Sequence, residues 1–212
     1  MSMEHSHNKN GLLVLLRHGK SLWNIQRIFT GWIDCDIAPE GIDEAHKAAR
    51  KLKDYHFTGA YTSVLQRAIK TLDIILKDLN QSSVPVIKNE ALNERHYGDL
   101  QGRKKDEVKA EVGEEQFNLW RRSYDNAPPN GESLKDTAQR TVPYFQQSIL
   151  PKLKEGETIL VSAHGNSLRS IVMELENIPA KEISNLNIPT GVPYLYEFDG
   201  TGKVISKKIL TS

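Results

Sequence analysis

Short apolar runs alternate along the chain with longer stretches in which apolar residues recur at helical spacing. The spacing of Ile42, Ala45, Ala48, Ala49 and Leu52 after Pro39 is one such stretch, and it predicts a helix with these residues on its buried face. By the same reasoning, strands are expected over 12–16, 59–63, 84–87 and 158–161, and helices over 39–52, 64–79, 133–153 and 167–175. The last apolar runs, 192–198 and 204–210, flank the turn Asp199-Gly200 and predict a closing hairpin.

This alternation indicates an α/β fold with a mostly parallel central sheet and helices on both faces. The hairpin is expected to add an antiparallel edge at the C-terminus. Pro143 is expected to kink the 133–153 helix or to split it in two.

The polar middle of the chain, 93–130, is different. It predicts two mostly polar helices, over 104–111 and 114–124, and lacks the apolar residues for a core of its own. We therefore interpret it as a helical and loop insertion that covers a site, within one domain spanning 11–212 that follows a mobile leader, 1–10.

Charge and cysteine content narrow the class of protein. The 212 residues carry a net charge of +1, so nothing in the composition favours nucleic acid or a membrane surface as a partner. Cys35 is the single cysteine, which excludes an intrachain disulfide and favours a reducing compartment. The leader has no apolar segment typical of a signal peptide, and the run 12–16 is too short to span a bilayer. A soluble, cytoplasmic protein is expected.

Two of the predicted strands end on the same dipeptide. The first runs into Arg17-His18-Gly19 and the later one into His164-Gly165. Ligands of such sheets bind beyond the carboxyl ends of the strands, so His18 and His164 are expected to meet there. The glycine after each histidine is expected to let the backbone turn sharply and to leave its amide open to a ligand.

The residues around these histidines favour an anion over a metal ion. The sequence has no His-x-x-x-His pair and no set of cysteine ligands, and Arg17 beside His18 disfavours a bound cation. Arg67 lies just past another strand, at the start of a helix, where backbone amides also favour anions. Guanidinium groups bind phosphate in a bidentate manner, so a phosphate site without a metal is predicted.

A phosphate held there makes His18 a candidate nucleophile that forms a phosphohistidine. Arg17, Arg67 and His164 would then stabilise the charge that develops on the transferring group. A leaving alkoxide needs a proton, and Glu94, in a loop after the 84–87 strand, is the candidate general acid.

Several segments resemble the cofactor-dependent phosphoglycerate mutases of the histidine phosphatase superfamily. The similarity extends from about Leu12 to Phe198. Arg-His-Gly alone fits any phosphatase of the superfamily, whereas "LNERHYG", "WRR" and "NIPTGVP" are specific to the mutase branch. The similar segments are "LLRHG", "SLWN", "FTGW", "AYTSVLQRAIKT", "LNERHYGDLQG", "WRRS", "SAHGNSLR" and "NIPTGVP".

The resemblance implies interconversion of 3-phosphoglycerate and 2-phosphoglycerate in glycolysis and gluconeogenesis, without a metal. It implies that His18 is phosphorylated, with 2,3-bisphosphoglycerate as the primer, that Arg17, Arg67 and His164 form the phosphate pocket, and that Glu94 carries the proton. The residues that it implies for substrate binding are Asn24, Thr30, Gly31, Tyr97, Lys105, Arg121, Arg122, Gly165 and Asn166. Small phosphoglycerates are the expected partners, and homo-oligomeric assembly stays open.

The sequence departs from the family in three places. Lys20 replaces an acidic or amide residue; it is expected to tighten anion binding, to lower the pKa of His18 or to point to solvent. The loop 123–130 is short, and the chain stops at Ser212, where many relatives carry a covering tail. Measurable hydrolysis beside mutase activity is therefore expected. The alternatives are a phosphatase of the same superfamily and a non-catalytic protein that binds a phosphorylated ligand.

Overall fold

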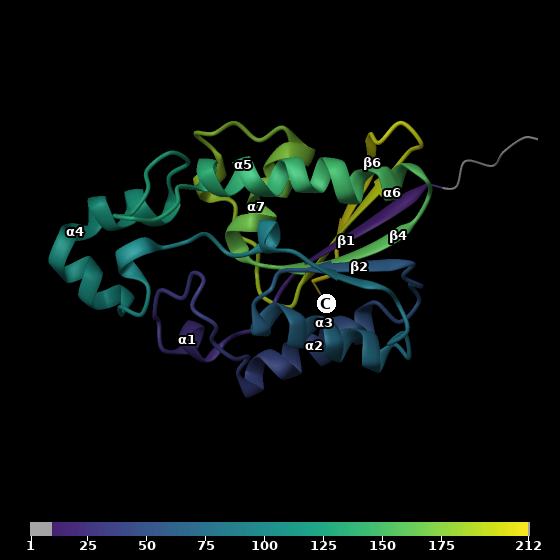
Figure 1. Ribbon diagram of the computed structural model, residues 1–212, viewed down its shortest axis with the longest axis horizontal. Helices are drawn as coiled ribbons and strands as arrows, with labels where there is room; N and C mark the ends of the chain where they lie inside the picture. Colours follow the sequence, from purple (N-terminus) through teal and green to yellow (C-terminus); the bar gives the residue numbers. More distant parts are fainter. Residues whose placement is uncertain (1–9, 212) are drawn as a thin grey trace, which may run out of the picture.

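The computed structural model describes residues 10–211 and is built around a six-stranded sheet in the order β3-β2-β4-β1-β5-β6 (Figure 1). The strands β3, β2, β4 and β1 pair in parallel, and β5 and β6 add the antiparallel edge, which confirms the predicted fold class. The strands are β1 Gly11–Arg17, β2 Gly59–Thr62, β3 Val86–Lys88, β4 Thr158–Ala163, β5 Pro193–Phe198 and β6 Val204–Ile209. The expected leader lies outside the described residues except for Asn10.

Helices cover both faces of this sheet. Figure 1 shows α2 and α3 on one side and α5, α6 and α7 on the other. The helices are α1 Leu22–Ile25, α2 Pro39–Lys51, α3 Gln66–Asp78, α4 Lys105–Arg122, α5 Leu134–Tyr144, α6 Leu150–Lys154 and α7 Gly165–Glu176. The short elements are the 3-10 turns η1 Glu90–Leu92, η2 Gly98–Leu100 and η4 Ile183–Asn185, and the π-helical turn η3 Phe145–Ile149.

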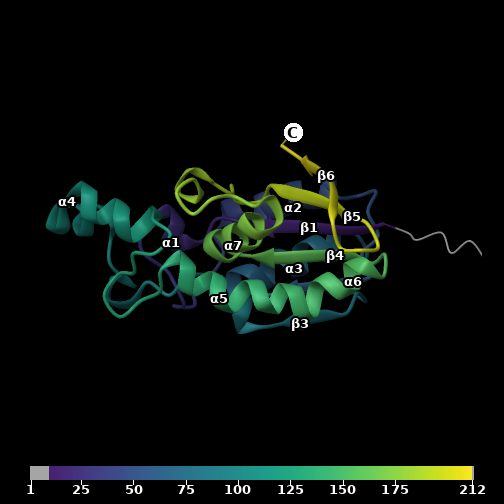
Figure 2. The ribbon, with the colours of Figure 1, turned by 90° about the horizontal axis from the view of Figure 1, so that it is seen from above.

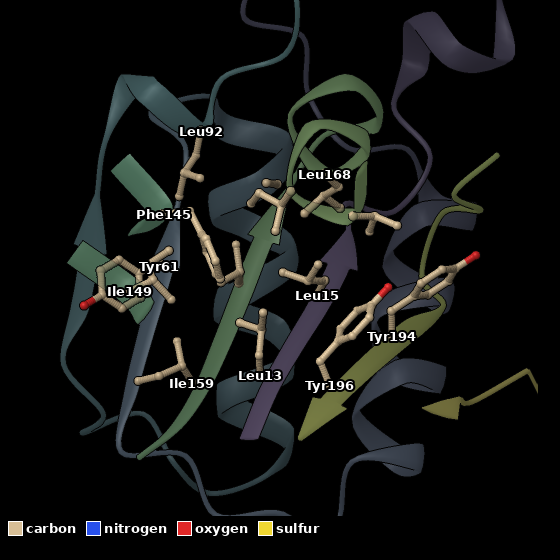
Figure 3. Close-up of a cluster of buried hydrophobic side chains, with 14 of the residues drawn as sticks. Leu13, Leu15, Tyr61, Leu92, Phe145, Ile149, Ile159, Leu168, Tyr194 and Tyr196 are labelled. Carbon is tan, nitrogen blue, oxygen red and sulfur yellow. The ribbon is translucent and has the colours of Figure 1, made fainter. Parts of the chain in front are cut away.

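The central strand β1 explains why its apolar run is unbroken. Leu13 and Leu15 pack on the side of α7 and η3, in the cluster of Figure 3, while Val14 and Leu16 pack on the side of α2 and α3. Each of these four side chains is at most 1% exposed. A strand buried on both faces has no polar face, so its residues do not alternate.

Two details of the predicted helices differ in the structure. Ile42 is 37% exposed, so its expected place on the buried face of α2 is wrong. Gly41 takes the buried position, because a Cβ there would lie 2.2 Å from the carbonyl oxygen of Lys20. The stretch 133–153 is not split into two separate helices: Pro143 lies near the end of α5, and the π-helical turn η3, with helical backbone angles at both ends, continues α5 into α6.

The polar middle projects beyond the carboxyl ends of β1 and β4, at the end of the molecule far from residue 10 (Figure 2). The two predicted helices are joined in α4, with a break at Gly113, whose φ of 81° a residue with a side chain rarely adopts. The expectation that this region lacks apolar residues for a core is wrong in part. Leu100, Val108 and Phe117 of this region form a small separate cluster, which Phe29 from an earlier part of the chain completes. Within residues 10–211, no helix is long and apolar enough to cross a membrane.

Candidate active site

The two histidines meet at one edge of the sheet. Strands β1 and β4 are parallel neighbours in a register that pairs Arg17 with Ala163, so each strand delivers its next residue to the same place. The ring centroids of His18 and His164 are 4.9 Å apart, and both side chains are buried.

The glycines after these histidines play different parts. The amide of Gly19 donates to Thr71 Oγ1 at 3.1 Å, so the expectation that it is open to a ligand is wrong. Gly19 is required because a Cβ there would lie 2.2 Å from the carbonyl oxygen of Gly41, at the start of α2. Gly165 is the first residue of α7, and its amide has no hydrogen-bond acceptor within the described part of the chain. That amide lies at the positive end of the dipole of α7, where an anion is favoured.

His18 is held in the state that a nucleophile needs. Its Nδ1 lies 2.7 Å from the carbonyl oxygen of Gly19, and a carbonyl only accepts, so Nδ1 carries the proton and Nε2 keeps its lone pair. Burial lowers the pKa of His18 well below its usual value, and Arg67 and Arg17 lower it further. The ring is therefore neutral at physiological pH.

His164 is held through its other nitrogen. Nε2 of His164 lies 2.7 Å from Ser63 Oγ, which also accepts the amide of Leu65. Ser63 Oγ makes no hydrogen bond to another acceptor within residues 10–211, so we assign its hydroxyl as the donor to Nε2, which leaves the proton of His164 on Nδ1. Burial lowers the pKa of His164, with Arg67 the next cause. Nδ1 is buried and has no partner in the described chain.

Two arginines supply positive charge beside these rings. Arg67, the second residue of α3, is 1% exposed, and its guanidinium donates to the carbonyl oxygens of Gly31 at 2.8 Å and Ile33 at 3.2 Å. Arg17 donates from Nη1 to the carbonyl oxygen of Ile188 at 2.9 Å, while its Nε is buried without a partner among residues 10–211. Neither arginine forms an ion pair in that range, so both positive charges are available to an anion.

Glu94 is buried against the same group. Its Oε1 accepts the amides of Arg95 at 2.8 Å and Asn166 at 3.0 Å, and its Oε2 has no hydrogen bond within residues 10–211. Burial alone raises the pKa of Glu94, but Arg17, the two amides and Arg67 outweigh it, so the pKa is lowered. Glu94 is therefore ionised when the site holds no anion, and Oε2 is the oxygen that can take a proton.

The structure brings all the residues named from the sequence to one place. They line a single pocket, except His164, whose ring centroid lies 4.9 Å from that of His18. Lys105, Arg121 and Arg122 reach it from α4, and Asn166 donates to Tyr97 Oη at 3.3 Å. Burial lowers the pKa of Lys105, with Arg121 and Arg17 also lowering it, as expected for cations gathered without a carboxylate.

Sequence reasoning missed six further lining residues. Arg169, one turn after Asn166 on α7, donates to Asn166 Oδ1 at 3.1 Å and to the carbonyl oxygen of Ile183. Its place three residues after Asn166 was a signal that could have found it. The other lining residues are Ile28, Phe29, Leu186, Asn187 and Ile188.

Lys20 points outward, which was one of the three expectations for it. Its ammonium lies 3.4 Å from Glu44, and the side chain is 51% exposed. It lines a shallower outer hollow, which shares Arg17, Asn24, Lys105 and Arg121 with the pocket. Within the described range, no group of three histidine, cysteine, aspartate or glutamate side chains is placed to hold a metal ion.

The site combines a neutral histidine that has a free nitrogen with two arginines that lack carboxylate partners and with a buried glutamate, and this chemistry suits a phosphoryl group. The fold and site together are those of a mixed α/β phosphoryl-transfer protein. The family model described as "Histidine phosphatase superfamily (branch 1)" matches residues 13–210. The chain belongs to this superfamily.

Relatives and solved structures agree with this assignment. The 2,3-bisphosphoglycerate-dependent phosphoglycerate mutase of Parvibaculum lavamentivorans is 51% identical over 201 residues, which cover 94% of this chain and 96% of the relative. The phosphoglycerate mutase of Schizosaccharomyces pombe is 50% identical over 94% of this chain and 95% of its own. The structure of Bacillus stearothermophilus YhfR is similar with a TM-score of 0.79 at 29% identity, covering 91% of this chain and 93% of that one.

Proposed function

We propose that this chain is a phosphoglycerate mutase that interconverts 3-phosphoglycerate and 2-phosphoglycerate through a phosphohistidine on His18. The observation that carries the proposal is the pairing of a neutral His18, whose Nε2 keeps its lone pair, with a buried Glu94 beside Arg17 and Arg67. About 50% identity over nearly the full length to enzymes named as phosphoglycerate mutases supports this substrate class over the phosphatase and the non-catalytic alternatives.

The pocket fits a primer with two phosphates and a carboxylate. Arg17 Nε, Thr30 Oγ1 and His164 Nδ1 are buried and have no partner within residues 10–211, as expected of groups that contact one phosphoryl group. Lys105, Arg121 and Arg122 lie at the outer part of the pocket and would hold the second phosphate or the carboxylate. When bound, 2,3-bisphosphoglycerate supplies the phosphoryl group that first loads His18.

Glu94 then works in both directions. In transfer from His18 to a bound monophosphate, the ionised Glu94 takes the proton of the substrate's free hydroxyl while that oxygen bonds to phosphorus and the bond to Nε2 breaks. In the return transfer, Nε2 bonds to the other phosphoryl group and Glu94 gives its proton to the departing oxygen. A phosphoryl group near Arg17 and Arg67 offsets the two charges that lower the pKa of Glu94, so burial then raises that pKa and favours the protonated form.

The test of the proposal is loading followed by turnover. Incubation with 2,3-bisphosphoglycerate should place acid-labile phosphate on His18, and the loaded protein should convert 3-phosphoglycerate faster than it releases phosphate to water. Activity should survive exhaustive EDTA treatment and be blocked by vanadate, which resembles the transferring group. Release to water that outpaces transfer would instead favour the phosphatase, and absence of any loading would favour the non-catalytic protein.

The proton role of Glu94 has its own test. Glu94→Gln keeps the size of the side chain and removes the proton carrier, so turnover should fall by roughly 10²–10⁴-fold with little change in 3-phosphoglycerate binding. Near-normal turnover of this variant would assign the proton to another group. The single Cys35 and the glycolytic substrates favour the cytoplasm as the place of action.

A further inference from the structure

One arginine outside the pocket binds the backbone that carries Glu94. Arg140, on α5, donates to a row of carbonyl oxygens along this segment. From Nη1 it reaches Ala91 at 3.0 Å and Asn93 at 3.1 Å, and from Nη2 it reaches Glu94 itself at 2.9 Å. A further contact from Nη1 reaches the carbonyl oxygen of Glu90 at 3.3 Å.

The carboxylate of Glu132 fixes the orientation of the Arg140 guanidinium. Glu132 accepts Nε of Arg140 on one oxygen and Nη2 on the other, each at 2.8 Å, which is the bidentate geometry that holds an arginine in one orientation. Glu132 also accepts the amide of His96 at 2.8 Å and donates its own amide to the carbonyl oxygen of His96 at 2.7 Å. The pair therefore binds the chain on both sides of Glu94.

Trp32 completes the arrangement from a different part of the chain. Its indole Nε1 donates to the carbonyl oxygen of Glu94 at 2.6 Å, and the Arg140 guanidinium lies 5.4 Å from the centre of its ring. The carbonyl of Glu94 thus accepts from two side chains, while the carboxylate accepts the amides of Arg95 and Asn166. Arg140 makes no hydrogen bond to the carboxylate in the described structure, so it acts on Glu94 through the backbone.

We propose that Arg140, oriented by Glu132 and Trp32, is a positioning residue that places the Glu94 carboxylate for proton transfer. This rests on the proposed function of Glu94. A lysine has one nitrogen and cannot reach these carbonyls and both oxygens of Glu132 together. Displacing a catalytic group by about 1 Å can cost about 10²-fold in rate, so this residue outside the pocket can control turnover.

The experiment compares Arg140→Lys with Arg103→Lys. Arg103 also pairs with a glutamate, Glu111, but both side chains of this pair are exposed and neither bonds to the segment that carries Glu94. In Arg140→Lys, kcat for the mutase reaction should fall about 10- to 100-fold with little change in KM, whereas Arg103→Lys should leave both unchanged. Loading of His18 from 2,4-dinitrophenyl phosphate, whose leaving group needs no proton, should change less than threefold in Arg140→Lys.

Two further measurements separate positioning from a general loss of structure. In a Glu94→Gln background, Arg140→Lys should cause little additional loss, because the group that it positions is already absent. Glu132→Gln, which weakens the bidentate pair but keeps its shape, should reproduce a smaller part of the effect, and thermal melting should show each variant folded. If Arg140→Lys lowers loading from the aryl phosphate as much as mutase turnover, or acts fully in the Glu94→Gln background, the inference is overturned. If Glu94 does not carry the proton, the Glu94→Gln variant itself should have normal turnover, and this result distinguishes failure of the proposed function from failure of the inference about Arg140.

Discussion

The ends of β1 and β4, here called the β1 corner and the β4 corner, carry the same His-Gly dipeptide, yet their histidines differ in which ring nitrogen is protonated. At the β1 corner, His18 donates from Nδ1 to the carbonyl of Gly19, so Nε2 keeps a lone pair. At the β4 corner, His164 accepts at Nε2 from Ser63, so Nδ1 keeps a proton. One ring can attack phosphorus, and the other can donate a hydrogen bond to an oxygen of the transferring phosphoryl group.

The glycines differ in the same way. Gly19 uses its amide inside the protein and allows α2 to approach the strand end, which is a packing requirement. Gly165 is the first residue of α7, and its amide has no acceptor in the described chain, so that amide is available to a ligand. The difference teaches that a repeated motif indicates a shared location, while the partners of each copy decide its chemistry.

The largest expected effect separates the two histidines. His18→Ala should remove turnover completely, and no acid-labile phosphate should form, because the acceptor nitrogen is gone. His164→Ala should still become phosphorylated, about 10²–10³-fold more slowly, because it loses one donor to the transferring group. Rapid-quench labelling with 2,3-bisphosphoglycerate measures both, and His56→Ala, at an exposed position, is the control. Labelling of His18→Ala at another residue would contradict the assignment.

Substitution of the two glycines by alanine should affect different properties: stability in Gly19→Ala and turnover in Gly165→Ala. In Gly19→Ala the new Cβ meets the backbone of Gly41 at 2.2 Å, so the free energy of unfolding should fall by about 3 kcal/mol or more. In Gly165→Ala the nearest atoms are Arg17 Cζ at 3.5 Å and Glu94 Oε2 at 3.6 Å, an ordinary contact. Its stability should change by less than about 0.5 kcal/mol while turnover falls. Urea unfolding and mutase assays on both variants test this, and equal losses of stability would remove the distinction.

The free energy of unfolding should depend on pH because of His18 and His164. Burial lowers the pKa of His18 and His164 in the folded protein, whereas in the unfolded chain they titrate near 6.5. Below that pH the unfolded chain binds protons that the folded protein does not, so the free energy of unfolding should fall by up to about 1.4 kcal/mol per pH unit for each histidine. The loss begins as the pH decreases through about 6.5 and stops only at the lowered pKa of the folded state.

Urea unfolding between about pH 7.5 and about pH 5.5 measures this slope. The double variant His18→Gln/His164→Gln should lose most of the slope, and His56→Gln should keep it. A slope that survives the double variant would show that other groups cause the pH dependence.

The smallest effect concerns Ser63. Ser63→Ala removes the hydroxyl that fixes the proton of His164 on Nδ1, so turnover should fall by about tenfold or less, the value of one hydrogen bond. Ser162→Ala is the matched control, because Ser162 is equally buried and donates to the carbonyl oxygen of Ala68 instead. Both variants should lose about 1 kcal/mol of stability, but only Ser63→Ala should lose activity. Equal activity in the two variants would mean that Ser63 does not set the state of His164.

The sequence by itself determined the location of the site. The apolar runs of β1 and β4 predict strands, and parallel strands in one sheet end at one edge, so His18 and His164 were expected at the same edge. The structure added that β1 and β4 are neighbours, which brings the two rings together. The resemblance placed Glu94 and the α4 cations at the same edge. Helix spacing failed at Ile42, because Gly41 takes the buried position in close contact with the backbone of Lys20, and spacing alone does not report such an approach.

Only the tertiary structure decided which nitrogen of each histidine is free and what holds Glu94. Ser63 and His164 are 101 residues apart, and Arg140 and Glu94 are 46 apart, so no local pattern connects either pair. A serine after a strand and an arginine on a helix read as ordinary polar residues in the sequence. Their effect arises from hydrogen bonds whose direction depends on distances of a few tenths of an ångström, and packing of the complete chain sets those distances.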